Sequence, residues 1–154
     1  MKELIHRFKY YQKTLLRHFF GELMASFIRE YHLDIGQFDW VAPIPLHPSK
    51  LRERGFNQSL LLAEQLCRNF DKKLRPDVLL KVRQTKNQAE LSQKERWTNM
   101  EGAFRIKRSE KVSGKNILLI DDLLTTGATA SEAARALKEN GAQKVAVYTL
   151  AVAL

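Results

Sequence analysis

Residues 117–129 constrain the fold more than any other part of this 154-residue chain. The segment reads ILLIDDLLTTGAT: four apolar residues, two aspartates, and a stretch rich in threonine that contains one glycine. Four consecutive apolar residues are typical of a strand buried on both faces, as in a parallel sheet covered by helices. The small residues after them predict a loop that opens a helix over residues 129–140, which Gly141 ends. We expect both aspartates to lie where this strand ends.

The rest of the chain repeats this alternation of strand and helix. Short β-rich segments occupy residues 38–44, 78–82, 103–106 and 144–152, with a helical pattern between them at residues 57–70. Strands that alternate with helices over short loops predict an α/β fold with a doubly wound, mostly parallel sheet around one compact core. Ligands of such sheets bind at the carboxyl ends of the strands.

The N-terminal segment predicts an amphipathic helix, or two of them in succession. Between residues 4 and 31, apolar residues recur at spacings of about three and four. We expect these residues to pack inward, because a solvated basic face is commoner than one that touches a membrane or nucleic acid. The apolar set is Ile5, Phe8, Leu15, Phe19, Leu23, Phe27 and Tyr31.

Two helix starts and two loops are predicted around the middle of the chain. Asn57 is a candidate N-cap for the helix at residues 57–70, and Ser92 with Glu95 has the form of a capping box. Before Asn57, a basic loop carries His47, Lys50, Arg52, Arg54 and Gly55. Residues 83–93 are polar and predict a second, mobile loop.

Composition narrows the class of protein only moderately. The net charge of +9 suits a polyanionic partner such as a nucleotide, a pyrophosphate or nucleic acid. No run approaches the roughly 20 apolar residues of a membrane span, and the first nine residues carry too many charges for a signal peptide, so we expect a cytoplasmic protein. The single cysteine, Cys67, lies among apolar residues and predicts a buried thiol; the four histidines lack metal-ligand spacing, and we propose no zinc site.

The acidic pair and the loop after it suggest a specific ligand. Backbone N–H groups and hydroxyls of a helix-opening loop can bind a phosphate, and Gly127 permits a positive φ there. Asp121 and Asp122 can accept hydrogen bonds from neighbouring sugar hydroxyls, or hold Mg²⁺ with its waters. A phosphate at one end and a diol at the other describe a ribose 5-phosphate. The phosphate loop comprises Leu124, Thr125, Thr126, Gly127, Ala128 and Thr129.

Three other interpretations of this segment are weaker. Strand-end charges beside an ordinary helix cap would explain each piece but not their combination. A P-loop NTPase lacks support because no G-x-x-x-x-G-K-[ST] motif occurs. A phospho-acceptor receiver domain carries its acidic pair early, whereas only 32 of the 154 residues follow Asp122.

With these residues, the chain resembles the type I phosphoribosyltransferases, whose ligand motif is four apolar residues, two acidic residues and a Thr-Thr-Gly loop. Over nearly its whole length it is similar to the ComF (competence protein F) family within that superfamily. The residues that carry this closer resemblance are Pro43, Ile44 and Pro45, the run Arg54-Gly-Phe-Asn-Gln58, Gln88, Leu91 and Ser92, Arg96, and the run Gly102-Ala-Phe104.

The resemblance implies a ligand, phosphoribosyl pyrophosphate, and a role for further segments. The loop after the first strand would hold pyrophosphate, through Pro43, Ile44, Pro45, Arg52 and Arg54. The catalytic loop would fall near residues 83–96, residues 1–35 would form a helical hood near the accepting base, and residues 36–154 would form the core. Members of the family commonly begin with a four-cysteine zinc segment, which has no counterpart in this sequence; the sequence is either that of a shortened homologue or a piece of a longer protein.

These expectations combine into one mechanism and one rival. In the mechanism, Mg²⁺ and the basic loop neutralise the departing pyrophosphate while a nitrogen nucleophile of an unidentified base attacks the sugar. Asp121 and Asp122 favour the positive charge on the ribose, and one of Arg83, Lys86 or Arg96 covers the pyrophosphate. The rival is a binding module of the competence machinery that senses phosphoribosyl pyrophosphate or binds single-stranded DNA without turnover. The sequence leaves the acceptor and a homodimer open.

Overall fold

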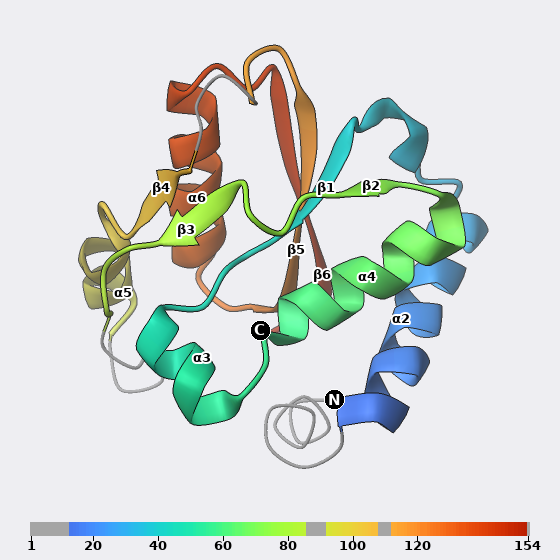
Figure 1. Cartoon of the computed structure of the whole chain (residues 1–154), viewed down its shortest axis with the longest axis horizontal. Coiled ribbons are helices and arrows are strands. Elements are labelled where there is room, and N and C mark those ends of the chain that lie inside the picture. The colour runs from blue at the N-terminus through green and yellow to red at the C-terminus, as the bar shows by residue number, and fades with distance from the viewer. Residues whose placement is uncertain (1–12, 86–91, 108–111, 154) are drawn as a thin grey trace.

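A four-stranded parallel sheet runs through the middle of the molecule in the order β2-β1-β5-β6 (Figure 1). The computed structural model describes residues 13–85, 92–107 and 112–153. The strands are β1 (Trp40–Pro43), β2 (Lys73–Leu74), β5 (Asn116–Leu124) and β6 (Lys144–Val152), and each neighbouring pair is parallel. The predicted doubly wound, mostly parallel fold is therefore confirmed.

Helices cover both faces of this sheet, and the core consists of two apolar clusters. On one face lie α2 (Lys13–Glu30) and α4 (Gln58–Phe70), which pack side by side (Figure 1). On the other lie α5 (Gln93–Met100), α6 (Ala128–Glu139) and a small antiparallel sheet of β3 (Leu79–Lys81) and β4 (Phe104–Ile106). A 3₁₀ turn, η1 (Ile35–Gln37), precedes β1, and α3 (Pro48–Arg54) follows it.

Several locally encoded features lie where the sequence predicts them. The Asn57 side chain caps α4 by accepting a hydrogen bond from Ser59 N at 3.1 Å, and Ser92 and Glu95 form a complete capping box on α5. The bounds of β6 match the predicted strand, and Cys67 is buried with 9% of its surface exposed. The two helix caps depend on contacts between residues close in sequence.

The predicted buried face of the N-terminal helix is wrong. The side chains of Phe19, Leu23 and Phe27 are 41–57% exposed and that of Tyr31 is 58% exposed. The core of this region comes instead from the adjacent row Phe20, Met24, Ala25 and Ile28. That row borders Gly21, whose missing side chain lets α2 approach α4 closely. Ile5 and Phe8 lie outside the described residues.

The basic segment before Asn57 is a helix, α3, and not the predicted loop. His47 caps its start by accepting a hydrogen bond from Ser49 N, Pro48 occupies the first turn, and Gly55 ends it with φ of 78°. Proline early in a helix and glycine just after it are ordinary helix boundaries. The helix has only seven residues, and these are mostly polar, so no apolar periodicity in the sequence predicts it.

Two strand predictions also need correction. The segment at residues 78–82 contains β3, but β3 pairs with β4 in the small antiparallel sheet and does not join the main sheet. The strand beside β1 is instead β2, whose two residues are too few for a sequence pattern. The central strand β5 extends beyond residue 120 to Leu124, because β6 continues to pair with it as far as Val152. Asp121 and Asp122 therefore lie within the strand.

Candidate functional site

The two aspartates of β5 lie near the carboxyl ends of the strands of the main sheet, and Asp121 is held by a contact from another element. Asp121 Oδ1 accepts hydrogen bonds from Ser59 Oγ at 3.1 Å and from Asp122 N at 2.9 Å. Ser59 belongs to the first turn of α4, so this contact joins the start of that helix to β5. Asp122 is buried, with 8% of its surface exposed, and Asp121 is half-buried. The two carboxylates thus differ in their access to a ligand.

The predicted phosphate loop connects β5 to α6. Gly127 adopts φ of 80°, the left-handed region, and a side chain added there would meet no atom within 4 Å. Glycine is therefore required by the backbone and not by crowding. Ser131 N donates to Gly127 O at 2.8 Å, which begins the helix, and in the first turn of α6 Ala128 N donates to Thr126 Oγ1 at 3.5 Å. Backbone N–H groups at such a helix start favour an anion.

The end of β1 lies directly beside the aspartates. Pro43 pairs with Ile120, and Ile44 N donates to Ile120 O at 2.9 Å. Asn57 then ties the start of α4 to this strand, because its Nδ2 donates to Ile44 O at 3.0 Å. The predicted pyrophosphate segment, residues 43–45, and the predicted ribose-binding pair therefore share one edge of the sheet. Their proximity follows from parallel pairing of β1 with β5.

The two arginines of the predicted pyrophosphate loop lie on α3. The side chain of Arg52 is exposed, while Arg54 is half-buried and donates from Nη1 to Gln58 Oε1 at 2.8 Å. Both residues fall in the last turn of the helix, where a positive charge interacts favourably with the helix dipole. Arg54 therefore supports the junction between α3 and α4.

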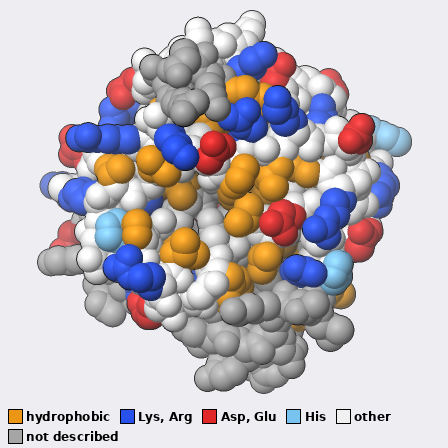
Figure 2. All heavy atoms as spheres, viewed as in Figure 1, with side chains coloured by type: hydrophobic (Ala, Val, Ile, Leu, Met, Phe, Trp, Pro, Cys, Tyr) orange, Lys and Arg blue, Asp and Glu red, His pale blue; other side chains and the backbone are white. Residues whose placement is uncertain are grey.

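A groove of about 900 Å³ opens between α3, the start of α4 and β3. Most of its lining is apolar, and Figure 2 shows hydrophobic side chains gathered in the middle of this face with Lys and Arg around them. Its polar lining includes Arg52, Asn57 and Lys81. Pro43 and Pro45 also contribute, so part of the predicted pyrophosphate segment borders an apolar space.

Lys81 is a candidate site residue that the sequence did not single out. Burial lowers the pKa of Lys81 below its ordinary value; the charge of Asp121 raises that pKa, and the charge of Arg83 lowers it further. The ammonium group therefore interacts electrostatically with Asp121 of the acidic pair. A lysine inside the apolar strand residues 78–82 is the sequence signal that could have marked it.

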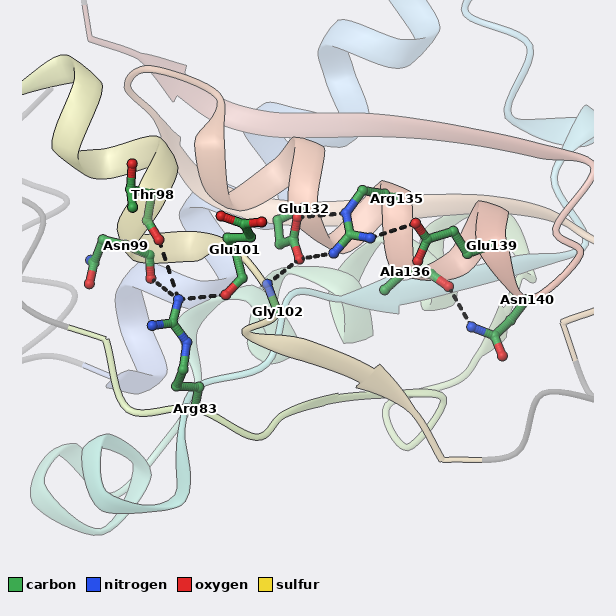
Figure 3. A network of polar contacts seen from close by, with 10 residues as sticks. All are labelled: Arg83, Thr98, Asn99, Glu101, Gly102, Glu132, Arg135, Ala136, Glu139 and Asn140. Atoms are coloured by element: carbon green, nitrogen blue, oxygen red, sulfur yellow. Dashed lines mark hydrogen bonds and ion pairs between the residues drawn. The ribbon is translucent and has the colours of Figure 1, made fainter.

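The three cations predicted to cover the pyrophosphate have different surroundings. Arg83 Nη2 donates to the backbone oxygens of Asn99 at 2.8 Å and Glu101 at 2.5 Å, at the end of α5 (Figure 3). This guanidinium therefore satisfies carbonyl groups that the helix end leaves open. Arg96 is half-buried on α5. Lys86 lies outside the described residues.

A polar network then joins this region to the phosphate loop helix (Figure 3). Gly102 N donates to Glu132 Oε1 at 2.7 Å, and Arg135 donates to both oxygens of the same carboxylate. The hydrogen bond from Arg135 holds the pKa of Glu132 below its ordinary value, with a further contribution from Gly102. Since Glu132 belongs to α6, the network connects the turn before β4 to the helix that Gly127 begins.

The donor set fits a magnesium ion that shares its coordination with a ligand. Mg²⁺ usually keeps several waters and is bound by one or two carboxylates together with substrate phosphates. Asp121 and Asp122 supply two carboxylates, and no group of three or more acidic, histidine or cysteine side chains with metal-binding geometry occurs among residues 13–85, 92–107 and 112–153. The described residues would therefore need oxygens from the ligand or water to complete such a site.

Comparison of the fold with solved structures shows the class of fold to which this chain belongs. It is similar to glutamine phosphoribosylpyrophosphate (PRPP) amidotransferase from B. subtilis, solved with ADP and GMP, with a TM-score of 0.56 and 20% identity over 87% of this chain and 26% of that one. It is also similar to purine phosphoribosyltransferase from Pyrococcus horikoshii, with a TM-score of 0.53 and 16% identity over 90% of this chain and 75% of the other. At these identities the likeness concerns the phosphoribosyltransferase fold alone.

Residues 57–153 match the family model described as phosphoribosyl transferase domain, so the chain belongs to that family. Among curated proteins it is 30% identical to competence protein F of Haemophilus influenzae, over 96% of this chain and 66% of that protein. It is 36% identical to competence protein ComFC of Bacillus subtilis, over 97% of this chain and 59% of that protein. DNA utilization protein YhgH of Escherichia coli is 30% identical, over 97% of this chain and 66% of that protein. These relatives confirm the resemblance to the ComF family.

The aligned region spans slightly less than two thirds of the length of each of these three relatives. Among the described helices, none combines the length and apolar character needed to cross a bilayer.

Proposed function

We propose that this chain binds phosphoribosyl pyrophosphate across the carboxyl ends of β1 and β5. One observation carries the proposal: Asp121 and Asp122 are followed by the last two residues of β5 and then by a loop whose glycine has a positive φ and begins α6. A diol-binding acidic pair and a phosphate-binding helix start thus follow each other within six residues. The second end of the ligand, its pyrophosphate, would face residues 43–45 at the same edge of the sheet.

Each part of the site has a distinct role in this proposal. Residues 124–129 hold the 5-phosphate through backbone N–H groups and threonine hydroxyls. Asp121 and Asp122 bind the ribose hydroxyls or hold Mg²⁺, which would neutralise pyrophosphate when bound. Ser59 fixes the orientation of Asp121. Lys81 and the α3 arginines supply positive charge beside the pyrophosphate, in addition to the predicted Arg83, Lys86 and Arg96.

We further propose that the bound sugar is transferred to a nitrogen nucleophile. The carbon–oxygen bond to pyrophosphate breaks as the carbon–nitrogen bond forms, and the pyrophosphate leaves with the bonding electrons. Positive charge that develops on the ribose is favoured by the neighbouring carboxylates. The Asp121 carboxylate is held by Ser59 and by the backbone N–H of Asp122 before any ligand arrives, so little reorganisation of this group is needed on binding.

Calorimetric titration with phosphoribosyl pyrophosphate and Mg²⁺ tests the ligand site. We expect saturable binding that requires Mg²⁺ and is weakened at least about tenfold in the Asp121→Asn, Asp122→Asn double variant. Asp39→Asn is the matched control, because this exposed aspartate lies at the amino-terminal end of the same strands. Its Oδ2 accepts a hydrogen bond from Asn116 N, at the start of β5. A folded wild-type protein that does not bind the ligand would contradict the proposal, as would equal binding by the double variant.

A second function, binding of single-stranded DNA without turnover, is favoured by the net charge of +9 and by relatives named for competence and DNA utilization. Pyrophosphate release measured with a panel of nucleobases separates the two. Steady release with one base supports transfer. Absence of release, together with a DNA association constant whose logarithm falls linearly with the logarithm of salt concentration, supports the binding module.

A further inference from the structure

Among the described residues, nothing pairs with the outer edge of strand β6, and the strand itself lacks the usual protection of an edge. In the part of the chain that the structure describes, β6 pairs only with β5 and is the outermost strand of the main sheet. Its nine residues, KVAVYTLAV, contain one charge, Lys144 at the start, and no proline. Natural proteins usually shorten an edge strand or place charges and prolines on it. The opposite edge follows this rule, since β2 has only two residues.

An exposed apolar row of α2 lies on the same side of the molecule. Gly21 and Arg29 of this helix face α4, because Gly21 meets Gln65 and Arg29 donates to Asn69. The row Phe19, Leu23, Phe27 and Tyr31 lies on the side of α2 that faces away from α4.

The position of α2 over the sheet then places this row beside the open edge. Tyr148 of β6 donates from Oη to Met24 O at 2.8 Å, so α2 lies over β6, whereas α4 lies over β1 and β5. The side of α2 that faces away from α4 therefore points toward the edge of the sheet that β6 forms. The exposed row and the outer edge of β6 together form one surface, here called the β6 surface.

We propose that a second copy of this chain docks on the β6 surface, with β6 of the two copies paired antiparallel about a two-fold axis. The two four-stranded sheets then become one continuous sheet, and the exposed rows of the two α2 helices pack beside the strand pair. Two-fold symmetry requires the antiparallel direction, and the surface is self-complementary because each copy offers a free strand edge and an apolar row.

The position of the one charge on β6 and the apolar area of the β6 surface both fit a second copy of this chain. In an antiparallel pair centred on β6, the two Lys144 side chains lie at opposite ends, roughly 26 Å apart at about 3.3 Å per residue, so they do not repel each other closely. Phe19, Phe27 and Tyr31 are about half exposed. With Leu23 and Val152 they offer roughly 500 Å² of apolar surface per copy, so two copies reach about the 1,000 Å² of a specific interface.

Analytical ultracentrifugation of the full chain tests the proposal. We expect the wild type to sediment at twice its chain mass of 17.8 kDa. Leu23→Lys on the row and Val152→Lys on the edge each place a charge in the interface and should weaken association about tenfold or more. Leu51→Lys is the matched control: Leu51 is also a helix residue with 42% exposure, against 41% for Leu23, but it lies at the groove.

Hydrogen exchange then tests strand pairing directly. We expect amides of residues 144–152 to exchange more slowly at high protein concentration, where the dimer forms, than at low concentration. A monomeric wild type would overturn the proposal. So would a dimer that Leu23→Lys and Val152→Lys leave intact, or one without concentration-dependent protection of β6. None of these results depends on binding of phosphoribosyl pyrophosphate, which the calorimetric titration tests separately.

Discussion

Individual side chains in this protein take their chemistry from partners far away in the sequence. Asp121 is held by Ser59, 62 residues earlier, and by the backbone of its own neighbour. Lys81 has a lowered pKa because it is buried, although Asp121 partly offsets that effect. A carboxylate and an ammonium group that interact beside a sheet edge differ from solvated charges, because burial strengthens their interaction.

Cys67 provides a test of burial at the residue scale. Desolvation raises the pKa of its thiol from an ordinary 9.0 to about 11, and the nearby charge of Glu64 adds to this effect. Because the thiolate is the reactive form, we expect alkylation at pH 8 to be roughly a hundredfold slower in the native protein than in urea. Stopped alkylation followed by mass spectrometry measures both rates. Native and unfolded rates within tenfold of each other would contradict this burial.

At the scale of elements, the packing of α2 against α4 depends on one missing side chain. A Cβ on Gly21 would lie 2.4 Å from Cβ of Gln65 and 2.7 Å from its Cγ. These distances are too short for carbon atoms in contact, so the two helices could not keep their present separation. The approach of the helices also decides which apolar row of α2 is buried.

We therefore expect Gly21→Ala to destabilise the protein. Alanine favours helix by about 1 kcal/mol, but overpacking at a contact this short should cost about 3 kcal/mol, so the net loss should be roughly 2 kcal/mol in the free energy of unfolding. Urea unfolding followed by circular dichroism measures it. Ser26→Ala is the control, because Ser26 is exposed on the same helix and should change stability by less than about 0.5 kcal/mol. A Gly21→Ala variant more stable than the wild type would refute this account of the packing.

At the scale of the whole molecule, α2 is joined to the main sheet by Tyr148 of β6. Its hydroxyl donates to Met24 O at 2.8 Å, and burial raises the pKa of Tyr148 to about 12. An unfolded tyrosine loses its proton near pH 10. Between pH 10 and about 12 the folded state therefore retains a proton that the unfolded state has lost, and stability falls as the pH rises.

Tyr148→Phe should remove this part of the pH dependence. We expect the variant to lose about 1 kcal/mol near pH 7, where a hydrogen bond to Met24 O is absent, and to show a shallower decline between pH 10 and 12. Urea midpoints measured from pH 7 to 12 supply both numbers. Tyr31→Phe, at an exposed position directly after the end of α2, controls for loss of a phenol. Identical slopes for wild type and Tyr148→Phe would show that Tyr148 does not couple folding to pH.

The sequence alone determined the central strand, the acidic pair, the loop after it, and the caps at Asn57 and Ser92. Each depends on contacts within about four residues, or on a run of apolar residues long enough to be buried by any partner. The family resemblance came from the same local segments. The roles assigned to the site residues remain predictions until the ligand experiments are made.

Only the tertiary structure decided how these segments meet. The apolar rows of α2 are adjacent on one helix, and α4 selects which row is buried by approaching at Gly21. The partner of β3, the proximity of Lys81 to Asp121 and the contact from Ser59 likewise join residues distant in the chain. Local sequence carries no record of such partners, because hydrophobic burial is non-directional and is satisfied by any surface that excludes water.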